Sequence, residues 1–156
     1  MSGTQRRAER TGPPRCTAAT RTSAETLDRS YPAEPDTVPL VRHEIAALAQ
    51  RHDATRPQVD DIRLAVSEAV ANAVTHGYRL AGGTIHAVAA IAARRLTLLI
   101  ADDGVGPTEP AQRPGAGWGW PVIAAVTERF TIRRRRSGGT EVEMQFRIGP
   151  DGGEPK

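Results

Sequence analysis

The chain has 156 residues, of which 38% are hydrophobic and 25% are charged, and its formal net charge is +3. This length suits a single domain with a buried core. Cys16 is the only cysteine, which excludes an internal disulfide and a cysteine-ligated metal cluster. No stretch is long and apolar enough to cross a bilayer, and the N-terminus lacks the apolar segment of a secretory signal, so we expect a cytoplasmic protein without membrane contact.

The positive charge is concentrated at the N-terminus. Residues 1–24 hold five arginines and one glutamate, which leaves sixteen basic and seventeen acidic side chains, a net charge of −1, on the remainder. Domains that bind nucleic acid usually carry a concentrated basic surface. We therefore expect no direct contact with nucleic acid.

Residues 1–35 are rich in Arg, Thr, Ala, Ser and Pro and have almost no large apolar side chains. Such a composition buries too little surface to offset the loss of chain entropy on folding. We expect a disordered arm over residues 1–35, a folded domain over residues 36–149 and a flexible tail over residues 150–156.

Two amphipathic helices are predicted after the arm. Asp36 and Thr37 are N-cap candidates for a helix that ends near residues 51–53. Thr55 can cap a second helix that has Pro57 in its first turn and continues to Gly77. In both helices, apolar residues recur at three- and four-residue spacing, at Val38, Val41, Ile45, Leu48 and Ala49 and then at Ile62, Val66, Ala69, Val70 and Ala73.

Two hairpins and a third helix are predicted in the second half of the chain. Residues 84–91 and 96–101 form the first hairpin, the helix contains Pro121 in its first turn, and residues 130–136 and 140–148 form the second hairpin. This order predicts an α+β fold, a two-layer sandwich in which about three helices cover one face of a mostly antiparallel mixed sheet.

An arginine run at residues 133–136 could be a nucleic-acid patch or a solvated strand face. Arg133 and Arg135 are predicted to point outward, and the neighbouring strand offers Glu141 and Glu143 as cross-strand partners. We favour the solvated, paired face.

Glu68 and Asn72 form a polar pair on the second helix. They are four residues apart and share a face beside the apolar stripe. Polar side chains that cannot readily reach water need a partner. A bound ion or ligand would provide one, and a solvated helix edge with ordinary hydrogen bonds is the alternative.

Asp102 ends an apolar strand and is followed by Gly104 and Gly106. Glycines allow a ligand to approach the main chain closely, and a carboxylate at this place can accept a hydrogen bond from an exocyclic amine such as that of adenine. The same pattern is also common in plain turns.

Gly115, Gly117 and Gly119 lead directly into the third helix. Free main-chain N–H groups and the positive end of the helix dipole suit phosphate groups. A glycine-rich connection alone is weak evidence. Its place after the Asp102 segment gives it weight.

Taken in this order, the three segments resemble the nucleotide-binding boxes of the Bergerat-fold ATPases, also called GHKL or histidine-kinase-like ATPases, over about residues 37–148. Within that group, the helix ending in residues 68–78 and the short loop before Gly115 resemble the bacterial anti-sigma factor serine kinases.

The resemblance implies an ATP-binding anti-sigma regulatory factor. Such a protein would be a serine/threonine kinase acting on a STAS-type anti-sigma-factor antagonist, would sequester a sigma factor, and often forms a homodimer. Glu68 would be the general base, Asn72 would coordinate Mg²⁺ and Asp102 would read the adenine amine. The remaining nucleotide contacts that the resemblance implies are Gly104, Gly106, Arg113, Gly115, Gly117, Gly119 and Thr140.

The sequence departs from the family where Trp118 and Trp120 flank Gly119 and Pro121 follows, because the family usually has an aliphatic residue there. We expect the tryptophans to cover the edge of the core rather than to stack on the nucleotide. Two alternatives stay open: a nucleotide-dependent binding module without catalysis, and a detached module that phosphorylates a histidine of another protein. The short loop between Gly106 and Gly115 disfavours the second.

Overall fold

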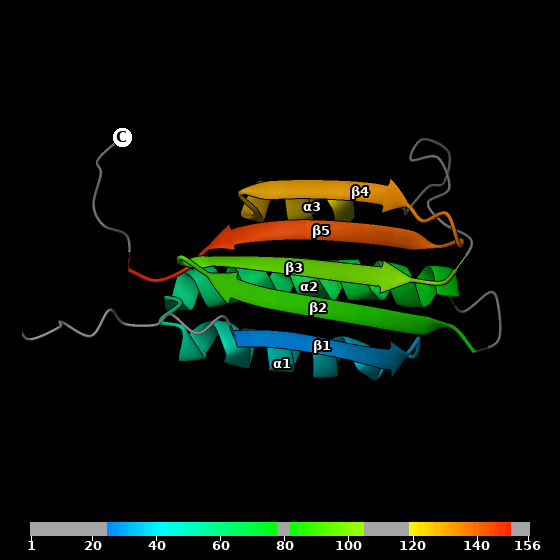
Figure 1. The fold of residues 1–156 in the computed structure, drawn as a ribbon, viewed down its shortest axis with the longest axis horizontal. Coiled ribbons are helices and arrows are strands. Elements are labelled where there is room, and N and C mark those ends of the chain that lie inside the picture. Colours follow the sequence, from blue (N-terminus) through cyan, green and yellow to red (C-terminus); the bar gives the residue numbers. More distant parts are fainter. Residues whose placement is uncertain (1–24, 78–81, 105–118, 151–156) are drawn as a thin grey trace, which may run out of the picture.

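The computed structural model describes residues 25–77, 82–104 and 119–150. These residues form five strands and three helices (Figure 1). In chain order, the elements are β1 (Glu25–Pro32), α1 (Thr37–Arg51), α2 (Arg56–Gly77), β2 (Thr84–Ala92), β3 (Arg95–Asp102), α3 (Gly119–Val126), β4 (Arg129–Arg134) and β5 (Thr140–Arg147).

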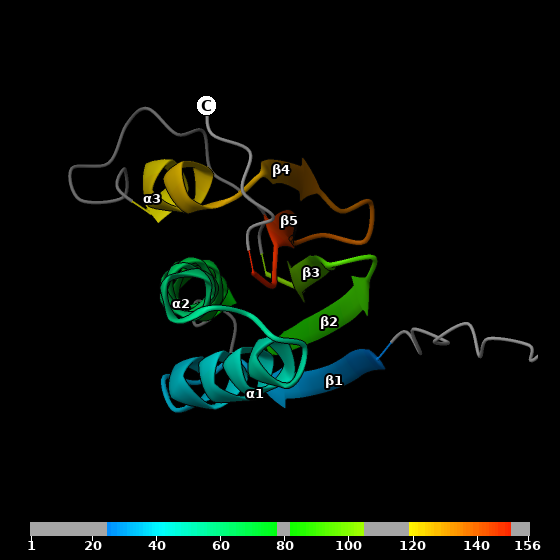
Figure 2. The same ribbon diagram turned by 90° about the vertical axis from the view of Figure 1, so that its left-hand side faces the viewer.

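The strands form one sheet in the order β1-β2-β3-β5-β4. Every described pairing in it is antiparallel, so the sheet is antiparallel throughout rather than mixed. All three helices lie on one face of the sheet, and α2 lies between α1 and α3 (Figure 2). The predicted α+β two-layer fold is confirmed.

The two long helices begin close to the predicted positions. Thr37 is buried and its hydroxyl donates a hydrogen bond to the carbonyl oxygen of Pro32 at 2.6 Å, whereas the Asp36 side chain makes no capping bond. At the start of α2, the Thr55 N–H donates to Oε1 of Gln58 at 2.9 Å, which satisfies a main-chain donor outside the helical ladder. Local side-chain chemistry therefore sets both starting points.

The core lies between the helices and the sheet. The predicted apolar stripes of α1 and α2 are buried except for Val38, which is partly buried, and Ile45 and Ile62 are fully inaccessible to solvent. In β5 the predicted alternation is also confirmed, because Val142, Met144 and Phe146 are buried while the intervening residues are partly exposed. Among the described residues, no helix has the length and apolarity needed to cross a membrane.

β1 is the largest difference from the sequence prediction. Residues 25–32, which the composition assigns to a disordered arm, form an edge strand paired with β2 along its whole length. Only Leu27 and Tyr31 add large apolar side chains to the core. The strand also pairs with α1 through Glu25–Arg51 at 2.7 Å, Glu25–His52 at 2.8 Å and Arg29–Glu44 at 2.6 Å. These partners lie 15 to 27 residues away, so local composition does not reveal them.

The remainder of the predicted arm, residues 1–24, lies outside the described residues, as does the part of the predicted tail at residues 151–156. Both stay predictions.

Candidate functional site

The described site residues form two clusters, one on the helical layer and one at the end of the sheet. The first lies where α3 begins against α2, and the second lies where β3 ends beside β5. β3 ends and α3 begins toward the same end of the molecule (Figure 1). The fold therefore brings segments that are far apart in the sequence to one end of the molecule.

The first cluster contains Glu68, Asn72 and Gly119. The two α2 side chains are half-buried, and neither forms a hydrogen bond to another described residue. A β-carbon at Gly119 would lie 3.0 Å from Nδ2 of Asn72 and 3.1 Å from Oε2 of Glu68. The first residue of α3 thus packs directly onto the polar pair, and its lack of a side chain makes this approach possible.

This cluster has the chemistry of an anion and metal site. The main-chain N–H groups of the first turn of a helix have no helical acceptor, and the helix dipole is positive there. Glu68 and Asn72 add side-chain oxygens beside that end, on the same face of α2.

Oxygen donors suit Mg²⁺, which keeps several water ligands and is usually held by one or two protein oxygens together with substrate phosphates. No group of three or more His, Cys, Asp or Glu side chains within the described ranges could hold a metal ion alone. The residues present therefore fit Mg²⁺ bound together with a phosphate ligand, with the side-chain oxygens of Glu68 and Asn72 as the candidate protein donors.

The second cluster is built on Asp102, which is only 4% exposed at the end of β3. Its Oδ1 accepts a hydrogen bond from the N–H of Gly104 at 2.9 Å. The β3–β5 register ends with the pair Ala101 and Glu141, so Thr140 is the next residue across from Asp102. Two buried polar side chains thus lie at adjacent strand ends.

The hydroxyl of Thr140 is buried and has no hydrogen-bond partner among the described residues. A buried polar group without a partner costs about 1–3 kcal/mol, and such groups are rare in folded proteins. A ligand that supplies a donor or acceptor beside Asp102 would satisfy it. The base of a nucleotide fits this requirement.

Two residues of the β4–β5 turn also contribute, and sequence reasoning missed both. Gly139 has φ +84°, and a β-carbon there would lie 1.9 Å from the carbonyl oxygen of Asp102. Nη1 of Arg135 donates a hydrogen bond to that same carbonyl oxygen at 3.0 Å. The two glycines before Thr140 indicate a turn in the sequence, but not which main-chain group the turn contacts.

The predicted pairing of the arginine run is therefore correct for one residue and wrong for another. Arg133 lies 3.9 Å from Glu141 and 3.9 Å from Glu143, as cross-strand pairing predicts. Arg135 instead follows the end of β4 and turns toward β3. The prediction that the Arg135 side chain points outward is wrong, because β4 and the alternation of its side chains end at Arg134.

The indole of Trp120 stacks on Phe130 with ring centroids 5.9 Å apart and packs against the core. The prediction that it covers the core edge is confirmed. Trp118 and the predicted contacts Gly106, Arg113, Gly115 and Gly117 lie outside the described residues.

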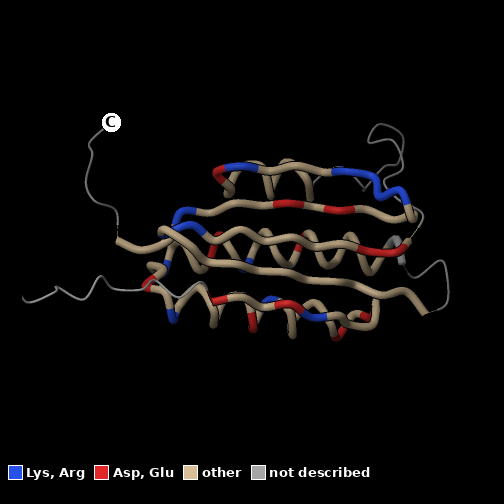
Figure 3. Tube along the Cα trace, in the orientation of Figure 1, with Lys and Arg blue, Asp and Glu red and all other residues tan. Residues whose placement is uncertain are grey.

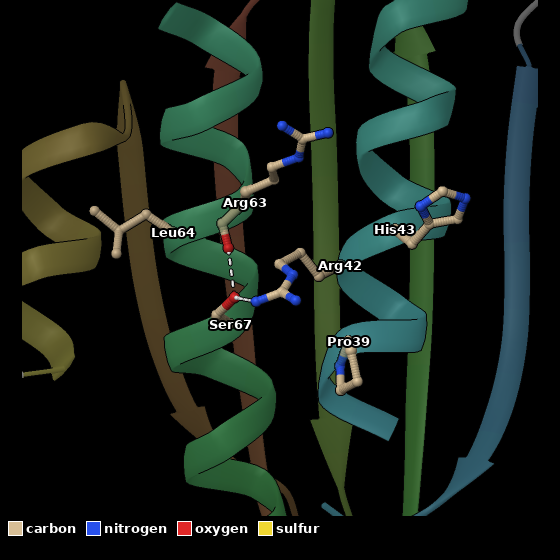
Figure 4. A pocket seen from close by; sticks show the side chains of 6 residues that line it. All are labelled: Pro39, Arg42, His43, Arg63, Leu64 and Ser67. Atoms are coloured by element: carbon tan, nitrogen blue, oxygen red, sulfur yellow. Dashed lines mark hydrogen bonds between the residues drawn. The ribbon is translucent and has the colours of Figure 1, made fainter. Parts of the chain in front are cut away.

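A separate groove of about 620 Å³ lies between α1 and α2 (Figure 4). Ser67 accepts a hydrogen bond from Nη1 of Arg42 at 3.5 Å and donates one to the Arg63 carbonyl at 2.7 Å. Leu64 is 43% exposed. The groove is lined by Pro39, Arg42, His43, Arg63, Leu64 and Ser67.

An antiparallel sheet covered on one face by three helices, with a polar pair on the central helix and a buried aspartate at a strand end, is the architecture of a histidine kinase-like ATPase domain. The family model of that description matches residues 31–146.

Similar proteins with curated names indicate which group within this family the chain belongs to. The chain is 30% identical over 130 residues to the anti-sigma F factor of Clostridium acetobutylicum, which covers 76% of this chain and 91% of that protein. It is 34% identical over 84 residues to the serine-protein kinase RsbW of Bacillus velezensis, and this match covers 53% of this chain and 52% of that protein. The chain belongs to the anti-sigma factor kinase family of histidine kinase-like ATPases.

A solved structure has the same fold. The crystal structure of the RsbU and RsbW domains of a Mycobacterium tuberculosis protein superposes with a TM-score of 0.64 at 24% identity. The match covers 80% of this chain and 32% of that longer chain, so it concerns the fold alone.

Proposed function

We propose that this chain binds ATP with Mg²⁺ and is a protein serine/threonine kinase that phosphorylates a STAS-type anti-sigma-factor antagonist and sequesters a sigma factor. The observation that carries the proposal is the meeting of Glu68 and Asn72 with the first residue of α3, Gly119. The relatives support it, because their names describe an anti-sigma factor and a serine-protein kinase.

At the base end, the buried carboxylate of Asp102 would accept a hydrogen bond from the exocyclic amine of adenine. The hydroxyl of Thr140, which lacks a partner among the described residues, would complete the contact. Gly104 keeps side chains away from this place, and Gly106, Arg113, Gly115 and Gly117 keep their predicted roles toward the base and phosphates as part of the proposal.

Bound magnesium-ATP would supply the phosphoryl group and neutralise its charge. Phosphoryl transfer asks the protein mainly for positioning and for electrostatic stabilisation. Asn72 would hold the metal through its amide oxygen, and the N-terminus of α3 would bind phosphate oxygens. Glu68 would accept the proton of the acceptor serine hydroxyl as that oxygen bonds to the γ-phosphorus and ADP leaves with the bridging oxygen.

The protein substrate must reach Glu68, and the groove between α1 and α2 is a described surface suited to it (Figure 4). Leu64 lies one helical turn before Glu68, and Ser67 is its neighbour in the chain. Arg42 forms no ion pair with a described carboxylate, so an acidic segment of the antagonist with an apolar anchor would complement the groove in charge and polarity.

Phosphotransfer is tested with γ-labelled ATP, Mg²⁺ and a purified candidate antagonist. The wild type is expected to label a serine of the antagonist. Glu68→Gln should keep ATP binding but lower transfer by about a hundredfold or more, because it removes the general base. Asn72→Ala should weaken the binding of ATP in the presence of Mg²⁺.

Two other results would change the conclusion. Tight ATP binding without transfer by the wild type would indicate a nucleotide-dependent binding module. Absence of nucleotide binding by the wild type would refute the proposal as a whole. Analytical ultracentrifugation with a purified sigma factor, with and without ATP, tests sequestration and, in the same run, the homodimer that the family resemblance implies.

The docking surface has its own test. Arg42→Glu and Leu64→Asp should raise the KM for the antagonist while the affinity for ATP stays unchanged. Arg56→Glu, an exposed charge reversal at the first residue of α2 and not among the residues that line the groove, is the matched control. Loss of sigma-factor binding with normal antagonist phosphorylation would assign the groove to the sigma factor instead.

A further inference from the structure

The turn that joins β4 to β5 is held tightly beside the base end of the candidate site. The N–H of Arg135 donates to the carbonyl of Gly139 at 3.1 Å, and the N–H of Gly138 donates to the carbonyl of Arg135 at 3.1 Å. Gly138 and Gly139 both have positive φ, +93° and +84°. Arg135 therefore stands at the base of a closed turn, with its main chain fixed on both sides.

The side chain of Arg135 reaches from this turn to the end of β3. Its Nη1 lies 3.0 Å from the carbonyl oxygen of Asp102, and the contact is partly buried. A hydrogen bond from a charged donor is about twice as strong as a neutral one. The same carbonyl faces Gly139 so closely that a β-carbon there would lie 1.9 Å from it.

This contact replaces strand pairing. The ladder between β3 and β5 ends at Ala101 and Glu141, one residue before Asp102. On the β5 side, the Asp102 carbonyl is therefore held by the arginine rather than by a strand partner. Its carboxylate in turn accepts the N–H of Gly104, so the main chain that directly follows the Asp102 side chain is held at two points.

We propose that Arg135 is the positioning residue that aims the Asp102 carboxylate at the exocyclic amine of the base, and so sets the preference for adenine over guanine nucleotides. The inference rests on the proposed function, in which Asp102 reads that amine. Adenine presents an amine donor where guanine presents a carbonyl acceptor. A carboxylate held in one place accepts a hydrogen bond from the adenine amine and repels the guanine carbonyl. A carboxylate that is free to move away discriminates less between the two bases.

The other arginines of the run make different contacts. Arg133 lies 3.9 Å from Glu141 and from Glu143, and Arg134 and Arg136 are exposed. Basic residues cluster at this end of β4, at the same end of the sheet as the acidic end of β3 (Figure 3). Arg136 is thus a control that has the same charge and is the next residue in the chain but makes no hydrogen bond to Asp102 among the described residues.

The test uses the full chain and titration calorimetry with ATP and, separately, with GTP. Arg135→Gln should weaken ATP binding by about tenfold, because a charge-assisted hydrogen bond is lost, and should change GTP binding by less than about twofold. Arg135→Lys keeps a charged donor and should recover part of the ATP preference. Arg136→Gln should bind both nucleotides like the wild type.

Thermal unfolding of each variant separates positioning from folding. A folded Arg135→Gln protein that keeps the wild-type ratio of ATP to GTP affinity would overturn the inference. An equal loss of ATP affinity in Arg135→Gln and Arg136→Gln that disappears at high salt would also overturn the inference, because the arginines would then attract the nucleotide by long-range charge alone. If Arg135→Gln does not fold, Arg135→Lys decides, since a wild-type nucleotide ratio at a lower melting temperature would show a purely structural role.

The experiments distinguish failure of the proposed function from failure of the role proposed for Arg135. The wild-type titration with ATP tests the nucleotide site itself, whereas the ratio between the two nucleotides in the variants tests Arg135. In phosphotransfer assays, Arg135→Gln should raise the KM for ATP at nearly unchanged kcat. Glu68→Gln should lower kcat instead.

Discussion

Thr140→Val should stabilise the free protein and weaken its binding to nucleotide. Thr140 is 4% exposed and its hydroxyl has no partner among the described residues. Valine has the same branched shape, so the strand conformation is kept while the hydroxyl is replaced by a methyl group. Leaving a buried hydroxyl unsatisfied costs about 1–3 kcal/mol, and valine removes that cost. The melting temperature of the free protein should rise by roughly 4 °C for each kcal/mol gained.

The nucleotide complex should respond in the opposite direction. A hydrogen bond from the hydroxyl to the ligand contributes about 0.5–1.5 kcal/mol, so ATP affinity should fall about two- to tenfold. Differential scanning fluorimetry without nucleotide and calorimetric titration with ATP measure the two effects. Thr97→Val, on the face of β3 away from the helices, is the control and should alter neither. A destabilised free protein with unchanged ATP affinity would refute the assignment of the hydroxyl to the ligand.

Three further substitutions test the fold and the site. Gly139→Ala should destabilise the fold by roughly 3 kcal/mol or more, because its β-carbon would lie 1.9 Å from the Asp102 carbonyl oxygen. Gly82→Ala, at φ +91° in open space, is the control and should cost only about 1 kcal/mol. Equal free-energy losses in chemical denaturation would contradict the close approach at Gly139. Gly119→Ala should keep the melting temperature but lower phosphotransfer, because its β-carbon would displace the ends of the Asn72 and Glu68 side chains; unaltered kcat and KM would argue against this contact. Burial and the hydrogen bond to Glu44 raise the pKa of Tyr31. The stability that this tyrosine contributes is therefore complete below its ordinary pKa of about 10 and is lost as the pH rises through the pKa of the folded state. Between pH 9 and 12, the free energy of unfolding should fall more steeply in the wild type than in Tyr31→Phe.

The helices and most strands were predictable because their signals are local. Spacing of apolar residues predicted a helix ending near residues 51–53 and a second ending at Gly77, and the structure has them at Thr37–Arg51 and Arg56–Gly77. The polar pair at Glu68 and Asn72 and the buried Asp102 at a strand end were likewise visible as patterns of three to five residues. Only the family resemblance joined these patterns into one site, and the structure places Gly119 beside Glu68 and Asn72.

β1 and the role of Arg135 were not predictable in this way. β1 has few apolar residues of its own, and its stability comes from hydrogen bonds to β2 and from side chains of α1 such as Glu44 and Arg51. Arg135 contacts a carbonyl 33 positions earlier in the chain. The outward direction expected for its side chain assumed a strand that in fact ends one residue before it.

The order of apolar and polar residues was sufficient to predict every element except β1, the face of the sheet that the helices cover and the residue types at the candidate site. The sheet order, the edge strand and the contact between the β4–β5 turn and Asp102 came only from the folded chain. The physical reason is that periodicity reports which face of an element is buried, whereas a hydrogen bond between distant segments depends on strand register and on where each strand stops. The base-reading end of the site, where Arg135 meets the Asp102 carbonyl, is of this second kind.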